Sequence, residues 1–432
     1  MGGSAQGILG NLLLQLCAIA LLVWAALAAA PATSTNDARL LCWLSVAAIT
    51  IMVLQLVPLP PGLWTALPGR EGVAQGYRLL GQEPPWLPWS LTPYQTIDSG
   101  LALLPPLAVL AAMLRLGAYQ SRYLALAIVL GAIAGVLLGA VQVTSDAGYL
   151  YPFTSRGQAA GLFANANYMG TLLLAAFPFV VALLARYRSR AGMARRQELG
   201  VYAIAGGAIA VLLLGLALNR SMAAGLLSIP VVLSSAALLV SPESRARLVL
   251  VGGALVVGIT GCIALASVPA LATGEAAVSV STRKDIYARS VVIAGDMFPV
   301  GAGVGAFPRI YPLYENPHAV DWVFVNHVHN DYLEFVLEAG LPALLLLALF
   351  LFWWTRRAVQ IWRSPVSSRF ARAATIASAA ILVHSAVDFP IRTAAIAAVF
   401  AAAVALMAEP RSRRAPETRG VRARPARHLS VD

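Results

Sequence analysis

The sequence predicts an all-α polytopic membrane protein with about 11 to 12 transmembrane helices and a large loop subdomain on the outer side. Hydrophobic residues make up 59% of the chain and charged residues 12%, whereas soluble domains are roughly half apolar and a quarter charged. The mean hydropathy is +0.75. Because a bilayer offers no water to unpaired backbone groups, the long apolar stretches must be helices.

Eleven windows are apolar and long enough to cross a hydrocarbon core, which needs about 20 helical residues. We expect them to form a single integral membrane domain over residues 1–408. The windows are residues 8–30, 40–58, 99–117, 121–143, 165–186, 200–218, 222–240, 247–268, 332–354, 372–388 and 391–408.

Arginine-rich loops predict the orientation, because short loops rich in Lys and Arg stay on the cytoplasmic side. Such arginines follow the fifth, seventh and ninth windows: Arg186, Arg188, Arg190, Arg195, Arg196, Arg245, Arg247, Arg356, Arg357, Arg363, Arg369 and Arg372. Alternation then places the N-terminus and these segments outside: residues 59–98, 144–164, 219–221, 269–331 and 388–392. The tail, residues 409–432, is predicted to be cytoplasmic and disordered, since it holds seven arginines and three prolines. We expect the tail to contact anionic membrane lipids and not nucleic acid.

The first large outer loop, residues 59–98, is rich in proline and contains Trp64, Trp86 and Trp89. Tryptophan near a membrane surface is usually an interfacial anchor, and stacking on sugar rings is the alternative. Polar side chains concentrate in the second loop, residues 269–331. Its apolar residues recur at helical spacing from Thr282 to Met297, which predicts an amphipathic helix on the outer surface.

Within the second loop, Arg283 and Tyr287 are one helical turn apart and would share a face. A glycine-rich turn follows, Pro299 to Phe307, which is no dinucleotide fingerprint because it lacks the flanking strand and helix. Gly303 and its neighbours either pack against a helix or let backbone N–H groups meet an anion.

The segment H-V-H-N-D-Y-L-E-F-V-L-E-A-G, residues 327–340, opens the ninth window. Asp331 is predicted to be its N-cap with Glu334 at the N3 position, so His329 precedes a helix N-terminus that favours negative charge. Glu334 and Glu338 lie one turn apart at the membrane edge, where buried acids are usually functional or paired. We expect both to face an arginine, Arg220 or Arg283 being the candidates.

No cofactor is predicted. The three cysteines, Cys17, Cys42 and Cys262, lie in apolar windows without paired spacing, so they indicate neither a disulfide nor a metal site. His327 and His329 alone cannot complete a ligand shell for zinc. Arg220 interrupts an apolar stretch in L-N-R-S-M, and an arginine in an outer turn opposes the positive-inside trend, which favours a functional role over a solvated turn residue.

Together these motifs resemble the O-antigen ligase and polymerase superfamily. The similar segments are N-R-S at residues 219–221, the stretch from Arg283 to Phe307, H-x-H-N-D-Y-L-x(4)-E-x-G, and G-L-F-A-N-A-N-Y-M-G at residues 161–170. The resemblance covers roughly residues 155–408. It implies a GT-C-like glycosyltransferase that acts at the periplasmic face of the bacterial inner membrane without metal or nucleotide.

The resemblance also implies the partners: an undecaprenyl-diphosphate-linked glycan as donor, and lipid A core or another lipid-linked glycan as acceptor. The family's two essential arginines match Arg220 and Arg283, and its essential histidine matches His329. The chain departs from the family in its predicted helix number and in the second histidine, His327, which leaves the choice of catalytic base ambiguous.

Further residues are predicted to bind substrate or complete the charge network around His329; they are His327, Asn330, Asn165, Asn167, Tyr287, Gly303, Glu338, Asp388 and Arg392. For Asp388, simple structural pairing with His384 is equally compatible with the sequence. A protein O-oligosaccharyltransferase is a further alternative, as is a transporter of lipid-linked sugars. Transporters, however, bind near the bilayer midplane between internal repeats, whereas the charges here gather at one edge.

Overall fold

The computed structural model describes residues 2–28, 35–116, 121–188, 194–240, 244, 252–254, 258, 275–315, 324–365 and 367–408. These residues are mainly helical, which confirms the predicted all-α fold class. The one sheet within the described residues is a short antiparallel pair, β1 (Pro58–Leu59) and β2 (Leu87–Pro88).

Seven helical spans among the described residues are long and apolar enough to cross a membrane. They are α1 (Ile8–Leu27), α2 (Asn36–Leu56), α5 with α6 (Pro93–Arg115), α7 (Ser121–Ser145), α8 (Ala166–Arg188), α9 (Arg195–Asn219) and α14 (Asp331–Arg363). Two shorter apolar helices are α10 (Met222–Ala236) and α16 (Ala394–Ala408), and α15 (Arg369–His384) fills most of the tenth predicted window. The predicted window at residues 247–268 lies largely outside the described residues.

Polar side chains define where several helices begin. Thr35, Ser221 and Ser368 each accept a hydrogen bond from the backbone N–H three residues further on, which satisfies one of the free donors at a helix start. Proline and glycine divide the longer elements. The third span, for example, consists of α5 (Pro93–Ala102) and α6 (Leu104–Leu116).

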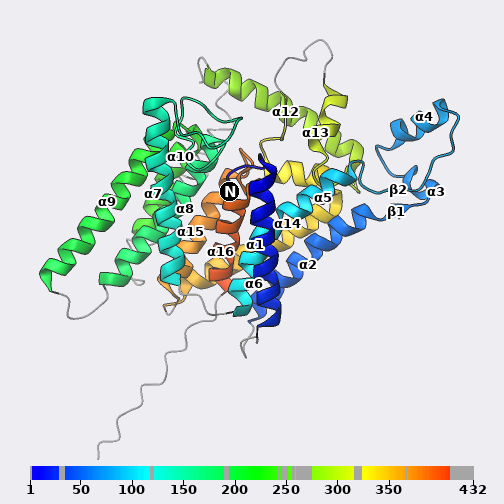
Figure 1. The fold of residues 1–432 in the computed structure, drawn as a ribbon. Coiled ribbons are helices and arrows are strands. Elements are labelled where there is room, and N and C mark those ends of the chain that lie inside the picture. The colour runs from blue at the N-terminus through cyan, green and yellow to red at the C-terminus, as the bar shows by residue number, and fades with distance from the viewer. Residues whose placement is uncertain are drawn as a thin grey trace, which may run out of the picture.

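The helices form two groups side by side (Figure 1). In one group, α8 is buried along most of its length and packs against α7, α9, α10 and α15. In the other, α16 and α1 pack against α6, while α2 and α14 lie beside them. Contacts of α16 with both α15 and α6 join the groups, so the apolar core is continuous between them.

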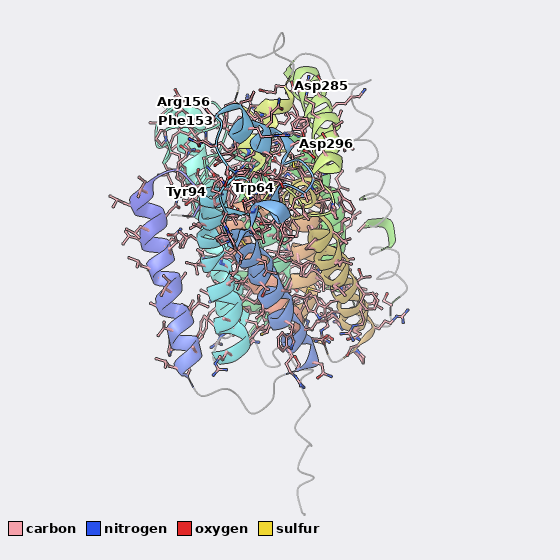
Figure 2. All side chains as sticks on the ribbon, turned by 90° about the vertical axis from the view of Figure 1, so that its right-hand side faces the viewer. Trp64, Tyr94, Phe153, Arg156, Asp285 and Asp296 are labelled. Atoms are coloured by element: carbon pink, nitrogen blue, oxygen red, sulfur yellow. The ribbon has the colours of Figure 1, made fainter. Side chains whose placement is uncertain are left out.

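The two ends of the bundle differ in chemistry. At one end Asp37 pairs with Arg356 and Arg357, and the Thr35 hydroxyl donates to the carbonyl of Ala408. At the other end, the chain start meets the loop at residues 146–165, where the Gln6 amide donates to the carbonyl of Phe153. Figure 2 shows Phe153, Arg156, Asp285 and Asp296 together toward this second end. The described parts of the segments predicted to lie outside therefore share one end, called here the outer end.

An outer lobe covers this end. It contains α3 (Pro61–Trp64), α4 (Glu71–Leu79), α12 (Glu275–Met297), α13 (Phe307–Ile310) and the 3-10 turn η2 (Tyr311–Tyr314). The predicted amphipathic helix corresponds to α12, which begins seven residues earlier than expected and buries Ile286, Ile293 and Met297. Interfacial anchoring is wrong for Trp64, which is 1% exposed and donates its indole N–H to the carbonyl of Pro85.

The glycine-rich turn packs its backbone against a break in α14. At Gly340 the helix is interrupted by a positive φ of 59°, and the amide of Leu341 beyond it donates to the carbonyl of Pro299 at 2.8 Å. In return the amide of Gly303 donates to the carbonyl of Glu338, also at 2.8 Å. A Cβ on Gly340 would lie 2.1 Å from the Pro299 oxygen, so only glycine fits this approach.

Candidate functional site

His329 lies in a strained turn directly before α14. Its φ is 60°, a conformation that non-glycine residues rarely adopt and that gathers at functional sites. The hydroxyl of Tyr287 on α12 holds the turn by donating to the carbonyl of His329 at 2.7 Å. The sequence predicts a helix on the outer surface here, but it does not predict this contact of α12 with the start of α14.

The N-cap prediction for α14 is wrong by one residue. Asn330 caps the helix, since its side-chain oxygen accepts from the amides of Tyr332 and Leu333 at 3.0 Å each. Its amide group donates to the carbonyl of Ala386. Asp331 is thus the first helical residue, and Glu334 is the fourth. Asn330 fixes the turn that carries His329, and its predicted contact with substrate stays a prediction.

The side chain of His329 contacts a buried carboxylate. Its Nδ1 lies 3.3 Å from Oδ1 of Asp388, which is 1% exposed in the turn between α15 and η3 (Pro390–Arg392). The second oxygen of Asp388 accepts a hydrogen bond from the side-chain amide of Asn167 in the first turn of α8. Three segments far apart in the sequence thus converge on Asp388.

Arg283 belongs to the same group. Its guanidinium donates to the carbonyl of Val387, next to Asp388, at 3.4 Å. Burial alone would raise the pKa of Asp388, but the hydrogen bond from His329 and the charges of His329, His384 and Arg283 lower it to about 2. The carboxylate is therefore ionised at neutral pH, beside an arginine and an imidazole.

A second histidine–carboxylate pair lies close by. Nδ1 of His327 is 2.7 Å from Oε1 of Glu334, which is fully buried. The ring of Phe389 contacts both imidazoles, with centroids 4.2 Å from His327 and 4.9 Å from His329. A carboxylate partner is consequently common to both histidines and cannot by itself identify a catalytic base.

The arginine that faces Glu334 and Glu338 is Arg392, not Arg220 or Arg283 as predicted. Its guanidinium lies 3.2 Å from Glu334 and 3.0 Å from Glu338, and also 3.6 Å from Asp331. The reason is the short 3-10 turn η3, which follows α15 and returns the chain to the start of α14. Sequence spacing within residues 282–340 gives no sign of this contact.

One side of a cavity of about 160 Å³ at the outer end is lined by His327, Glu334, Glu338 and Arg392. The other side comes largely from α5. Its lining residues are Gln95, Asp98, Ser99, Gly305, Pro308, His327, Glu334, Glu338 and Arg392. The sequence did not predict a role for the three residues of α5. Their spacing at i, i+3 and i+4 places them on one helix face, a signal that the apolar window starting at residue 99 concealed.

Arg220 lies in the turn between α9 and α10, exposed and with a φ of 56°. Its neighbour Asn219 is buried and donates its side-chain amide to the carbonyls of Ala159 and Ala166. Ala166 directly precedes Asn167, the partner of Asp388. Arg220 is therefore held near the first turn of α8, at the same outer end as His329.

Asn165 and Gly303 have structural contacts. The side-chain oxygen of Asn165 accepts from the backbone amide of Asn167 at the start of α8, a turn typical of a helix N-terminus. The amide of Gly303 is used in packing on α14, and a Cβ there would meet Ser90 at 2.1 Å. The packing interpretation of the glycine turn is thus favoured over an anion-facing one.

Arg70 is a further residue that sequence reasoning missed. It is 2% exposed and donates to the carbonyls of Pro68, Trp89 and Gly301, which fastens the first outer loop to the glycine turn. Burial lowers its pKa to about 10. Among the described residues, no group of three or more His, Cys, Asp or Glu is placed to hold a metal ion.

Residues 205–348 match the family model described as O-Antigen ligase. The match covers a third of the chain and supports the resemblance to the O-antigen ligase superfamily. It includes Arg220, Arg283, His327, His329, Glu334 and Glu338, whereas Asn167, Asp388, Arg392 and the cavity residues of α5 lie outside the match. The matched family implies glycosyl transfer with lipid-linked glycan substrates in general. No curated protein was found to match the chain.

Proposed function

We propose that the protein transfers a glycan from undecaprenyl diphosphate to an acceptor hydroxyl at the periplasmic face of the inner membrane. Ligation of O-antigen to lipid A core is the leading reaction, and polymerisation onto another lipid-linked glycan is the alternative. The observation that carries the proposal is the His329–Asp388 pair beside Arg283 at the outer end.

The pair gives His329 the form of a general base. An ionised carboxylate at Nδ1 favours the tautomer with its proton on Nδ1, which leaves the lone pair of Nε2 able to accept a proton. The acceptor hydroxyl would give its proton to Nε2 while its oxygen attacks the anomeric carbon. The bond from that carbon to the diphosphate breaks in the same step, so the configuration is inverted.

The leaving diphosphate gains negative charge as this bond breaks. Arg283 is close to His329 through Val387 and Asp388, and Arg220 lies at the same outer end. Guanidinium groups bind phosphate oxygens through two parallel hydrogen bonds, which favours arginine over lysine in this role. The two arginines would therefore hold the diphosphate and stabilise its charge in the transition state.

The test uses purified protein in proteoliposomes with an undecaprenyl-diphosphate-linked glycan and, separately, lipid A core or a second lipid-linked glycan. Release of undecaprenyl diphosphate and the anomeric configuration of the product are measured. We expect transfer to one acceptor with inversion, loss of transfer in His329→Ala, a smaller loss in His327→Ala, and no effect of EDTA. Retention of configuration, or an active His329→Ala protein, contradicts the mechanism. If undecaprenyl diphosphate is released with neither acceptor, the proposed function is contradicted.

A further inference from the structure

The cavity beside His327 differs in charge from the surroundings of His329. Two buried carboxyl groups of its lining, those of Glu334 and Glu338, lie within 3.2 Å of the single guanidinium of Arg392. Asp98, exposed on α5, adds a third acid at the cavity wall. Acidic groups therefore outnumber basic ones there. A diphosphate would be repelled from this cavity, because like charges in a partly buried site disfavour one another.

A hydroxyl-rich group suits the same lining. The α5 side offers an amide from Gln95, a carboxylate from Asp98 and a hydroxyl from Ser99, which together supply both donors and acceptors. The opposite side offers the imidazole of His327 over two buried carboxylates. Ring hydroxyls both donate and accept, so a neutral sugar can satisfy such a mixed set, whereas an anion can use only the donors.

The size and position of the cavity restrict the ligand further. Its volume of about 160 Å³ is below the roughly 300–1,000 Å³ of pockets for drug-sized ligands, so it holds a group of about one ring and not an extended glycan. His327 on its wall and His329 outside it both contact the ring of Phe389. A ring in the cavity would therefore lie next to the proposed base.

We infer that this cavity is the subsite for the acceptor sugar, and that it positions the ring whose hydroxyl attacks the donor. The inference rests on the proposed function for the identity of the reaction. The two ligands are thereby assigned to regions of different charge. The diphosphate binds on the side of Phe389 that carries His329 and Arg283, and the neutral acceptor ring binds on the side that carries His327, Glu334 and Glu338. Gln95 and Asp98 thereby become determinants of acceptor specificity.

Kinetics with two substrates test this assignment. In the proteoliposome assay, Gln95→Leu and Asp98→Asn should each raise the KM for acceptor about tenfold, which corresponds to about 1.4 kcal/mol. The KM for donor and kcat should remain within about threefold of wild type. Glu71→Gln, an exposed acid on α4 away from the cavity, serves as the matched control. An unchanged KM for acceptor in both cavity variants, or a raised KM for donor instead, overturns the inference.

A second measurement does not require transfer. Gln95→Cys is introduced after Cys17, Cys42 and Cys262 are replaced by Ala, and its rate of labelling by a maleimide is followed in detergent. Methyl glycosides of a hexose and of a heptose should slow labelling at millimolar concentration, while inorganic pyrophosphate should not. Equal protection by pyrophosphate, or protection by neither glycoside, overturns the inference. Protection by a glycoside in a protein that transfers nothing would support the subsite while contradicting the proposed function.

Discussion

The carboxylate of Asp388 is the single group on which the proposed mechanism most depends. Asp388→Asn removes its charge while nearly preserving its shape. The new amide oxygen can accept one hydrogen bond, but the amide nitrogen cannot accept from Asn167 or hold the Nδ1 proton of His329. The substitution therefore leaves a buried donor without a partner and removes the preference for the reactive tautomer of His329.

The expected magnitude follows from the pKa. The pKa of Asp388 falls from 3.8 to about 2 on folding, and a change of one in pKa corresponds to about 1.4 kcal/mol, so ionised Asp388 contributes about 2 kcal/mol to stability at neutral pH. Because the folded pKa is lowered, this contribution is complete above about pH 4 and is lost as the pH falls towards about 2. Asp388→Asn should lower stability by a similar amount and remove most of this pH dependence.

Catalysis should suffer more than stability. A positioned general base contributes about 10²- to 10⁴-fold, so the Asp388→Asn protein should lose about that factor in kcat for glycan transfer. Rates in proteoliposomes and the thermal midpoint in detergent are measured together, with Asp285→Asn as the control. Asp285 is an exposed acid on α12 at the same end (Figure 2). Wild-type kcat in a correctly folded Asp388→Asn protein would refute the base assignment.

Two further predictions concern the arginines and the orientation. Arg283→Lys keeps the charge but loses the paired hydrogen bonds to phosphate, so the KM for donor should rise and kcat fall while membrane insertion persists; Lys284→Gln on the same helix is the control, and near-normal transfer would return Arg283 to a structural role. In a protein without native cysteines, Leu313→Cys should react with an impermeant thiol reagent from outside, and Pro365→Cys only after permeabilisation. Both positions are exposed, and the reverse pattern would overturn the periplasmic assignment.

Composition and periodicity suffice to predict the helices but not their contacts. The apolar windows correspond to helices wherever the structure describes them. A bilayer offers no water to backbone N–H and C=O groups, so each segment must pair these groups within itself, as a helix does. The amphipathic pattern of α12 also corresponds to its packing, because Ile286, Ile293 and Met297 recur on one face and are buried there. Sequence does not determine where α14 begins, since Asn330 and Asp331 are both good caps and only the geometry selects Asn330.

Partners distant in sequence could not be predicted. Asp388 meets Asn167 across 221 residues and His329 across 59, and Gln95 reaches the cavity from the first third of the chain. The sequence indicates that Glu334 and Glu338 need a cationic partner. It contains several arginines, however, and does not show which of them forms the ion pairs. Arg392 is selected by the turn η3, whose path depends on how α15 packs against α8 and α16.

The site contains two histidine–carboxylate pairs of similar geometry, and the charges around them distinguish their roles. Near His329, Arg283 offsets the charge of Asp388, so a negatively charged leaving group can approach. Near His327, the buried Glu334 and Glu338 share Arg392, so a second anion is disfavoured. A transfer reaction needs two such environments, one for the diphosphate and one for a neutral hydroxyl. The distance between them must be no more than the width of one sugar ring. The shared contact of both imidazoles with Phe389 provides that proximity, which is why we assign proton transfer to His329 and acceptor placement to His327.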